Sequence, residues 1–187
     1  RQYPSDAVPV PEPGPGEALI RIVRASVCNG SDGALYSGHR EIPVAYPWME
    51  LPWTIGHECA GEIVALGSGT DGFQVGQRVA SLRYGAAFAD YQLVNIARDA
   101  LFPLPDSLSY DEATFIEVLW ATSLYMPYIE PQDRVVLMGL GPSGTMFLEQ
   151  CLGIGVNKLI CADQHDLRLN MARRLGATIT VNTQREN

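Results

Sequence analysis

The chain has few cysteines, a single lysine and no long hydrophobic run. Its cysteines form no Cys-x-x-Cys pair and stand far apart, at Cys28, Cys59, Cys151 and Cys161. This scatter argues against a disulfide framework and predicts a reducing, cytoplasmic compartment. No apolar stretch approaches the roughly 20 residues of a membrane span, and no signal-peptide pattern opens the chain.

Basic residues are also in deficit. The 187 residues carry 13 lysines and arginines against 21 acidic residues, a formal net charge of −8. An acidic surface repels the phosphates of nucleic acids and of anionic lipids, so we expect neither nucleic acid nor membrane as a partner. A hydrophobic fraction of 47% is ordinary for one or two globular domains.

The first part of the chain has the pattern of short strands separated by glycine-rich turns. Residues 4–16 are rich in proline and are expected to be extended. Residues 33–53 lack periodicity, which predicts an irregular loop. Strand candidates lie at 18–25, 61–66, 77–82 and 89–95. Residues 1 to about 108 therefore predict an all-β, barrel-like unit.

After residue 108 the pattern changes to alternating helices and strands. Ser109 and Glu112 form a capping box, in which each side chain satisfies a backbone N–H at a helix start. Helices are predicted over 113–116 and on to about 125, then over 145–152 and 167–175. Strands are predicted over 133–138, 158–162 and 177–181. This alternation is typical of an α/β unit with a parallel sheet.

Two segments of the first part hold potential metal ligands. Gly56-His57-Glu58 places a histidine beside a carboxylate, and Cys28 and Asp32 lie upstream in a short polar segment. A His-Glu pair alone is a weak signal. Together with the cysteine it matches the ligand types of a catalytic zinc, which keeps one position open for water or substrate.

A glycine motif marks the second part. Gly139-x-Gly141-x-x-Gly144 follows a predicted strand and opens a predicted helix, and Asp163 closes the next strand 19 residues later. This context is the dinucleotide-binding fingerprint, with the pyrophosphate on the helix N-terminus. The glycines would permit a tight turn, close approach of the pyrophosphate and close helix packing. The alternative is a glycine turn without a ligand.

The acid also bears on the choice of cofactor. Asp163 can accept hydrogen bonds from a ribose 2′-OH and would repel a 2′-phosphate, which favours NAD over NADP. Gln164 and His165 beside it weaken that preference. The expected cofactor-binding residues are Gly139, Gly141, Pro142, Ser143, Gly144, Asp163 and Arg168.

Five motifs in order resemble the zinc-dependent medium-chain dehydrogenase/reductase family, nearest to its polyol and threonine dehydrogenase branches. They are Cys28 with Ser31-Asp32, Gly56-His57-Glu58 with Gly61 and Gly67, Val75–Val79, Phe88–Tyr91 and Gly139–Gly144. The resemblance implies a GroES-like β-barrel catalytic domain at 1–120. A Rossmann domain with a doubly wound parallel sheet would follow, of which 121–187 supply the first half.

The resemblance also implies the roles of individual residues. Cys28 and His57 match the catalytic zinc ligands, and Glu58 matches the adjacent glutamate. Glu117 falls where relatives carry the remaining ligand, although it could be an ordinary charge on a helix surface. Whether Glu58 or Glu117 binds the metal directly stays open.

Two further residues complete the implied site. Asp32 matches the carboxylate that orients the zinc-bound histidine, and Ser31 matches the hydroxyl that relays the substrate proton outward. The implied activity is interconversion of a secondary alcohol, polyol or amino-alcohol-like, and its ketone with NAD. The alternatives are a zinc-free quinone or enoyl reductase and a non-catalytic nucleotide-binding relative. Cys28 and His57 argue against the zinc-free reductase.

The chain departs from the family pattern at three places. The four-cysteine lobe for a structural zinc is absent, so we expect one zinc per chain. The outer relay histidine is replaced by Gly33-Ala34-Leu35, and His39 either substitutes or has no role. We also expect a fragment, whose full-length form is a homo-oligomer. Four side chains could line the substrate pocket or pack in the core: Tyr46, Trp48, Met49 and Trp53.

Overall fold

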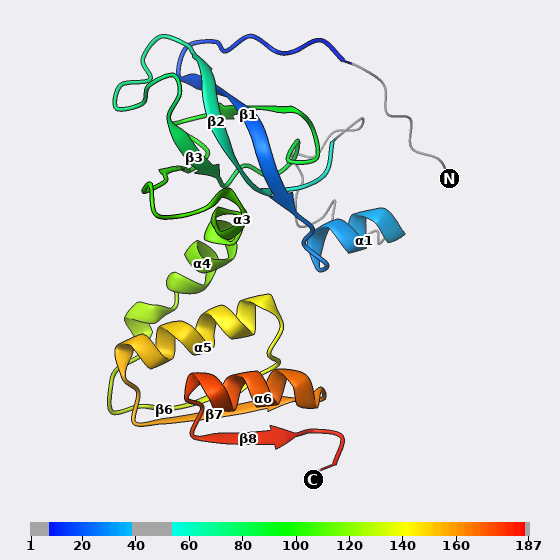
Figure 1. Cartoon of the computed structure of the whole chain (residues 1–187), viewed down its shortest axis with the longest axis vertical. Helices are drawn as coiled ribbons and strands as arrows, with labels where there is room; N and C mark the ends of the chain where they lie inside the picture. The colour runs from blue at the N-terminus through cyan, green and yellow to red at the C-terminus, as the bar shows by residue number, and fades with distance from the viewer. Residues whose placement is uncertain (1–7, 39–53, 186–187) are drawn as a thin grey trace. The chain divides into compact units, whose positions relative to one another are not determined.

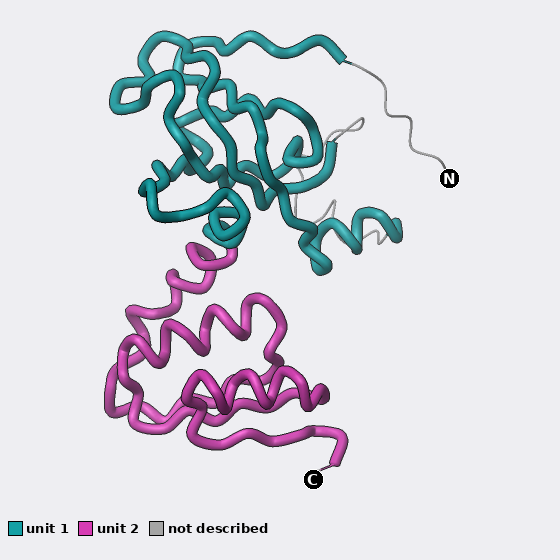
Figure 2. Tube along the Cα trace, viewed as in Figure 1, with its two compact units in different colours: residues 1–117 teal, residues 118–187 magenta. Residues whose placement is uncertain are grey.

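The computed structural model describes residues 8–38 and 54–185 (Figure 1). The chain divides into two compact units, residues 1–117 and residues 118–187 (Figure 2). Helix α4, Ile116–Ser123, runs through the division, and the predicted domain boundary at 120/121 stays a prediction. No helix in the described part of the chain is long and apolar enough to cross a membrane.

The first unit is built on an antiparallel sheet with the strand order β4-β1-β2-β3-β5. Its strands are β1 Glu17–Ser26, β2 Glu58–Leu66, β3 Arg78–Ser81, β4 Tyr91–Asn95 and β5 Leu101–Pro103. The four predicted strands are present. The fifth was not predicted, because three residues are too few to show the two-residue period of a strand.

Strands β1 and β2 form the centre of this sheet. Their register pairs Ala18 with Leu66 at one end and Ser26 with Glu58 at the other. Ile20 and Ile63 point from these strands into a core that they share with Val79 and Val94 of the neighbouring strands. The packed centre holds the two strands together, and an irregularity between Ile22 and Arg24 sets the pairing at the Ser26–Glu58 end.

Gly61 lets the two central strands approach each other. A Cβ atom at this position would lie 2.2 Å from the carbonyl oxygen of Arg21 on β1. No rotamer change relieves such an overlap, because the obstacle is backbone. The glycine is therefore required by the register rather than by a turn.

A short helix, α1 Ser31–Ser37, replaces the first residues of the predicted irregular loop. The prediction was wrong here because the helix start depends on a local contact that periodicity does not reveal. The carbonyl oxygen of Cys28 accepts from the N–H of Asp32 at 2.9 Å, and the carboxylate of Asp32 accepts from the N–H of Cys28. Gly38, with φ of 75°, ends the helix in the left-handed conformation.

A second helix of the first unit confirms the capping box. Helix α3, Tyr110–Ala113, begins after Ser109, whose hydroxyl accepts from the N–H of Glu112. The Glu112 carboxylate in turn accepts from the N–H of Ser109 at 2.9 Å. Both orphan N–H groups at the helix start are thus satisfied, as predicted.

The second unit is a parallel sheet in the order β6-β7-β8 with helices α5 and α6 over one face (Figure 1). The elements are α4, the 3₁₀ helix η1 Met126–Tyr128, β6 Arg134–Met138, α5 Pro142–Ile154, β7 Lys158–Asp163, α6 Asp166–Leu175 and β8 Ile179–Asn182. The helices and strands pack around a buried cluster that includes Leu148, Leu159 and Leu169. The predicted alternation of strand and helix is confirmed.

We predict opposite effects of alanine at two glycines. Gly61→Ala should destabilise the chain by about 1–3 kcal/mol, because overpacking against the β1 backbone forces the strands apart. Gly153→Ala, within α5 and with no atom within 4 Å of the added Cβ, should stabilise it by about 0.5–1 kcal/mol. Urea unfolding of both variants measures the difference. An unchanged midpoint for Gly61→Ala would contradict the β1–β2 register.

Candidate metal and cofactor sites

The ends of β1 and β2 bring three of the predicted metal ligands together. One donor atom each from Cys28, His57 and Glu58 lies within 4.8 Å of the others. His57 and Glu58 are only 4% and 5% exposed, whereas Cys28 is half-buried. Two of the three donors therefore come from the interior of the unit and the third from its edge.

The strand register positions Glu58. This residue opens β2 and lies opposite Ser26, the last residue of β1. The Ser26 hydroxyl donates a short hydrogen bond to the Glu58 carboxylate. Sequence reasoning missed Ser26, because its contact depends on strand pairing between residues 32 positions apart.

His57 is held at both its edge and its face. Its Nδ1 lies 3.5 Å from Oδ1 of Asp32, a buried carboxylate oxygen with no hydrogen-bond partner. The ring stacks on Tyr84, with the centroids 4.8 Å apart and an angle of 15° between the planes. A carboxylate beside Nδ1 favours the tautomer with the proton on Nδ1, which leaves Nε2 available to a metal.

Glu117 lies near the three donors but is not among the atoms within 4.8 Å of one another. Its pKa is raised, mainly by burial, while the nearby His57 lowers it and Glu58 raises it. The Glu117 carboxylate therefore interacts electrostatically with both His57 and Glu58. Of these two glutamates, Glu58 is the one with a carboxylate oxygen within 4.8 Å of the Cys28 and His57 donor atoms.

Two further polar groups border the donors. The Cys28 Sγ lies 3.7 Å from the hydroxyl of Ser31, so the predicted relay residue is at the site. The thiol of Cys59 is adjacent in sequence, but burial raises its pKa to about 12. Cys59 stays protonated near neutral pH and is unsuited to bind a metal as thiolate.

The donor set fits a zinc ion. Burying a carboxylate without a counter-charge costs free energy. At this site three carboxylates, those of Asp32, Glu58 and Glu117, lie close to the single imidazole of His57. A cation bound by thiolate, imidazole and carboxylate would offset that cost. His39 and the four side chains predicted to line a substrate pocket or core lie outside the described residues.

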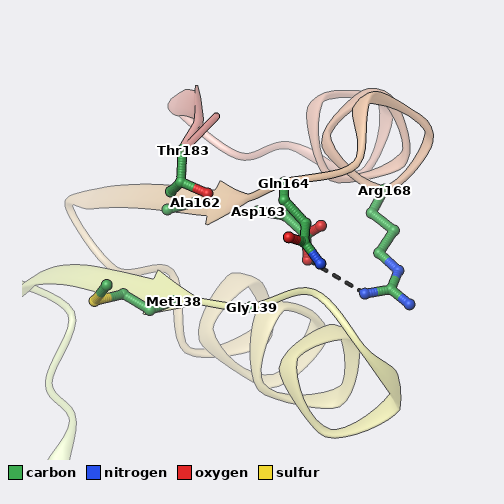
Figure 3. A pocket seen from close by; sticks show the side chains of 7 residues that line it. All are labelled: Met138, Gly139, Ala162, Asp163, Gln164, Arg168 and Thr183. Atoms are coloured by element: carbon green, nitrogen blue, oxygen red, sulfur yellow. Dashed lines mark hydrogen bonds and ion pairs between the residues drawn. The ribbon is translucent and has the colours of Figure 1, made fainter. Parts of the chain in front are cut away.

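A second site lies in the parallel-sheet unit, where the carboxyl ends of β6 and β7 meet α6. A pocket of about 360 Å³ opens there (Figure 3). It is lined by Met138, Gly139, Ala162, Asp163, Gln164, Arg168 and Thr183. In sheets of this kind, ligands bind outside the carboxyl ends of the strands.

Asp163 is the centre of hydrogen bonding at this pocket. One carboxylate oxygen accepts from the N–H of Leu140 at 2.7 Å, and the other accepts from the N–H of His165 at 2.8 Å. The guanidinium of Arg168 lies 3.5 Å away. Burial acts to raise the pKa of Asp163, but these partners together lower it. The acid is thus a fixed, ionised group that already holds the glycine turn.

The glycine motif has the geometry that its sequence suggested. Gly139 has a φ of 95°. A Cβ atom at Gly144 would lie 2.0 Å from the carbonyl oxygen of Gly139. A Cβ at Gly141 would meet no atom within 4 Å, and no side chain caps α5 after it. Pro142 and Ser143 form the first turn. Open space in front of an uncapped helix start suits an anion.

Comparison with known proteins identifies the class. Residues 14–106 match the alcohol dehydrogenase GroES-like domain. All of the chain aligns at 31% identity with 60% of sorbitol dehydrogenase from Bacillus subtilis (strain 168). L-threonine 3-dehydrogenase from Xanthomonas axonopodis pv. citri is 28% identical, over 96% of this chain and 59% of that enzyme. The chain spans about 60% of the length of these relatives.

Solved structures agree. An alcohol dehydrogenase from E. coli CFT073 complexed with cofactor NADH superposes with a TM-score of 0.80 at 26% identity, over 95% of this chain and 58% of that one. A quinone oxidoreductase from Pseudomonas syringae pv. Tomato DC3000 gives 0.82 at 25% identity, over 97% and 54%. The fold alone therefore does not choose between these two reactions.

The chain belongs to the medium-chain alcohol dehydrogenase family. The fold expected from the resemblance, a GroES-like antiparallel sheet followed by a short parallel sheet with helices, is confirmed. The sorbitol and threonine dehydrogenase relatives are those of the branches that the motifs indicated.

We predict a pH-dependent role of Asp163 in stability. Because its pKa is lowered in the folded chain, its contribution is present above the ordinary value of 3.8 and lost as the pH falls through the folded value. Asp163→Asn should therefore destabilise the chain by about 1–3 kcal/mol at pH 7, and this difference should shrink at acid pH. Unfolding followed at both pH values tests this. Exposed Glu149→Gln is the control and should differ little from wild type.

We also predict selective alkylation of the cysteines. Iodoacetamide should modify Cys28 and spare the buried thiols of Cys59, Cys151 and Cys161, whose pKa values burial raises. Mass spectrometry of the native chain should show one rapid adduct. Equal rates at Cys28 and Cys59 would contradict the geometry described above.

Proposed function

We propose that this chain carries the catalytic metal site and part of the cofactor site of an NAD-dependent zinc dehydrogenase. Its reaction would interconvert a secondary alcohol, polyol or amino-alcohol-like, and its ketone. The observation that supports this most strongly is the meeting of Cys28, His57 and Glu58 within 4.8 Å. The named activities of the sorbitol and threonine dehydrogenase relatives agree with it.

Cys28, His57 and Glu58 would hold one zinc, with Glu117 beside them. When bound, such a zinc polarises a hydroxyl or carbonyl oxygen as a Lewis acid and makes the hydroxyl proton easier to remove. Asp32 keeps the His57 ring in one tautomer and orientation. Ser26 keeps the Glu58 carboxylate in place, so that the donors are fixed before any ligand arrives.

Ser31 is the proposed first acceptor of the substrate hydroxyl proton on its path from the metal site to solvent. Its hydroxyl borders Cys28 at 3.7 Å and opens α1, whose residues are more exposed than Asp32. A hydroxyl can accept one proton while donating another, which suits a relay from a buried donor set to solvent. Gly33 and Ala34 supply no further titratable group on this path.

The pocket between β6, β7 and α6 would take the adenosine end of NAD. Asp163 stays ionised, because its partners lower its pKa. Its oxygens already accept backbone hydrogen bonds, but each has a further lone pair that can accept from a ribose hydroxyl. Its charge disfavours a 2′-phosphate, whereas Arg168 at 45% side-chain exposure favours one. We propose NAD because the carboxylate lies deeper and is fixed by three partners. The cofactor would carry the hydride.

A zinc-free quinone reductase is the second candidate, supported by the likeness in fold to such an enzyme. Against it stands the grouping of Cys28, His57 and Glu58, since a zinc-free reductase needs no set of metal donors within 4.8 Å of one another. A non-catalytic relative is disfavoured by the same residues. Metal content separates these classes directly.

We predict about one zinc per chain by elemental analysis, lost in Cys28→Ala. The matched control is Cys59→Ser, which changes a thiol that is not a donor and should keep its zinc. Oxidation of sorbitol, threonine and simple secondary alcohols, followed by the absorbance of reduced nicotinamide, then tests the reaction. That assay uses the longest natural protein that carries this chain. A protein that contains no zinc and oxidises none of these alcohols would overturn the proposal.

A further inference from the structure

Residues 83–88, here called the 83–88 loop, lie across the segment that leads into His57. The N–H of Gly85 donates to the carbonyl of Gly56 at 2.9 Å, and that of Phe88 donates to Ile55 at 3.1 Å. The N–H of Ala86 donates to Thr54 at 2.7 Å. Backbone pairing therefore ties this loop to the residues just before the metal donors.

The close approach of the 83–88 loop to residues 54–56 requires unfavourable backbone conformations in both segments. Gly56 has a φ of 94°, and a Cβ there would lie 2.9 Å from Ala87 and Phe88. Ala86 has a φ of 62°, the one positive value recorded for a non-glycine residue in the described ranges. Unfavourable backbone persists where its surroundings enforce it, and such positions cluster at functional sites.

A buried side chain anchors the same loop from the sheet. Gln92 on β4 is 0% exposed. Its amide nitrogen donates to the carbonyls of Gly85 at 2.7 Å and Arg83 at 3.4 Å, on either side of Tyr84. Its oxygen accepts from the Cys59 thiol at 3.5 Å. The amide nitrogen of Gln92 thus fixes the 83–88 loop, while its oxygen is held by the thiol of Cys59 on β2.

Tyr84 connects the anchor to the metal donor. Its ring stacks on His57 with the centroids 4.8 Å apart, while Asp32 faces the ring's Nδ1 edge. The stack limits rotation of the imidazole about its long axis, and the carboxylate limits its tilt.

We propose, resting on the proposed function, that the 83–88 loop is a fixed platform for the His57 imidazole, and that Gln92 positions this metal ligand through Tyr84. Gln92 is thus a positioning residue for zinc affinity, although it binds neither metal nor substrate. The effect travels through one stacked ring, so it should vanish when that ring is removed.

Two readouts test the proposal. In the metal-free chain, the carbon-bound protons of His57 should show an upfield ring-current shift, assigned by its loss in His57→Gln. Gln92→Met and Tyr84→Leu should each abolish the shift and weaken zinc binding about tenfold in chelator competition. Tyr84→Phe, which retains the ring, should keep both the shift and the zinc affinity.

The double variant decides whether Gln92 acts through Tyr84. Gln92→Met in the Tyr84→Leu background should weaken zinc no further, because coupled residues are not additive. Additive losses, or a His57 shift unchanged by Gln92→Met, would overturn the proposal. If Gln92→Met does not fold, Gln92→Asn serves in its place, since a carboxamide one methylene shorter cannot reach Gly85.

The two readouts separate this proposal from the proposed function. A chain that shows the ring-current shift but binds no zinc would refute the dehydrogenase site and leave the platform intact. A chain that binds zinc without the shift would refute the platform alone.

Discussion

The pairing of the last residue of β1 with the first residue of β2 is the constraint on which the proposed metal site depends. Ser26 and Glu58 lie opposite each other because an irregularity between Ile22 and Arg24 shifts the register by one residue relative to the packed centre of the two strands. The chain leaves β1 toward Cys28 and enters β2 from His57, so both donors arrive at one end of the sheet. A shift of one residue would turn Glu58 to the other face.

Electrostatics explains why this end of the sheet is built as it is. Asp32, His57 and Glu58 are each at most 5% exposed, and the described partners of these acids are a hydroxyl, an N–H and an imidazole. Buried carboxylates without a full counter-charge destabilise a fold by several kcal/mol. A divalent cation, if bound as proposed, would reverse that balance and would couple the stability of the unit to metal binding.

The sequence predicted the elements of the fold and the donor types better than it predicted their supports. Cys28, His57 and Glu58 entered the hypothesis because zinc restricts the residue types that can bind it, and the structure places their donor atoms within 4.8 Å of one another. Tyr84 and Gln92 carry no such restriction, and their contacts arise from a loop that folds back on residues 54–56. Helix α1 was missed for a similar reason, since it begins at a reciprocal contact rather than at a periodic pattern.

The second unit shows why the glycine motif and its distant acid form one signal. Asp163 accepts the N–H of Leu140 from within the motif, between Gly139 and Gly141. The acid therefore fixes the turn with the same carboxylate that, under the proposed function, would meet a ribose. The spacing of 19 residues spans α5 and β7, and the parallel pairing of β7 with β6 places Ala162 beside Met138. Turn stability and the proposed ligand recognition would thus favour the same residue, which makes this pattern more informative than its glycines alone.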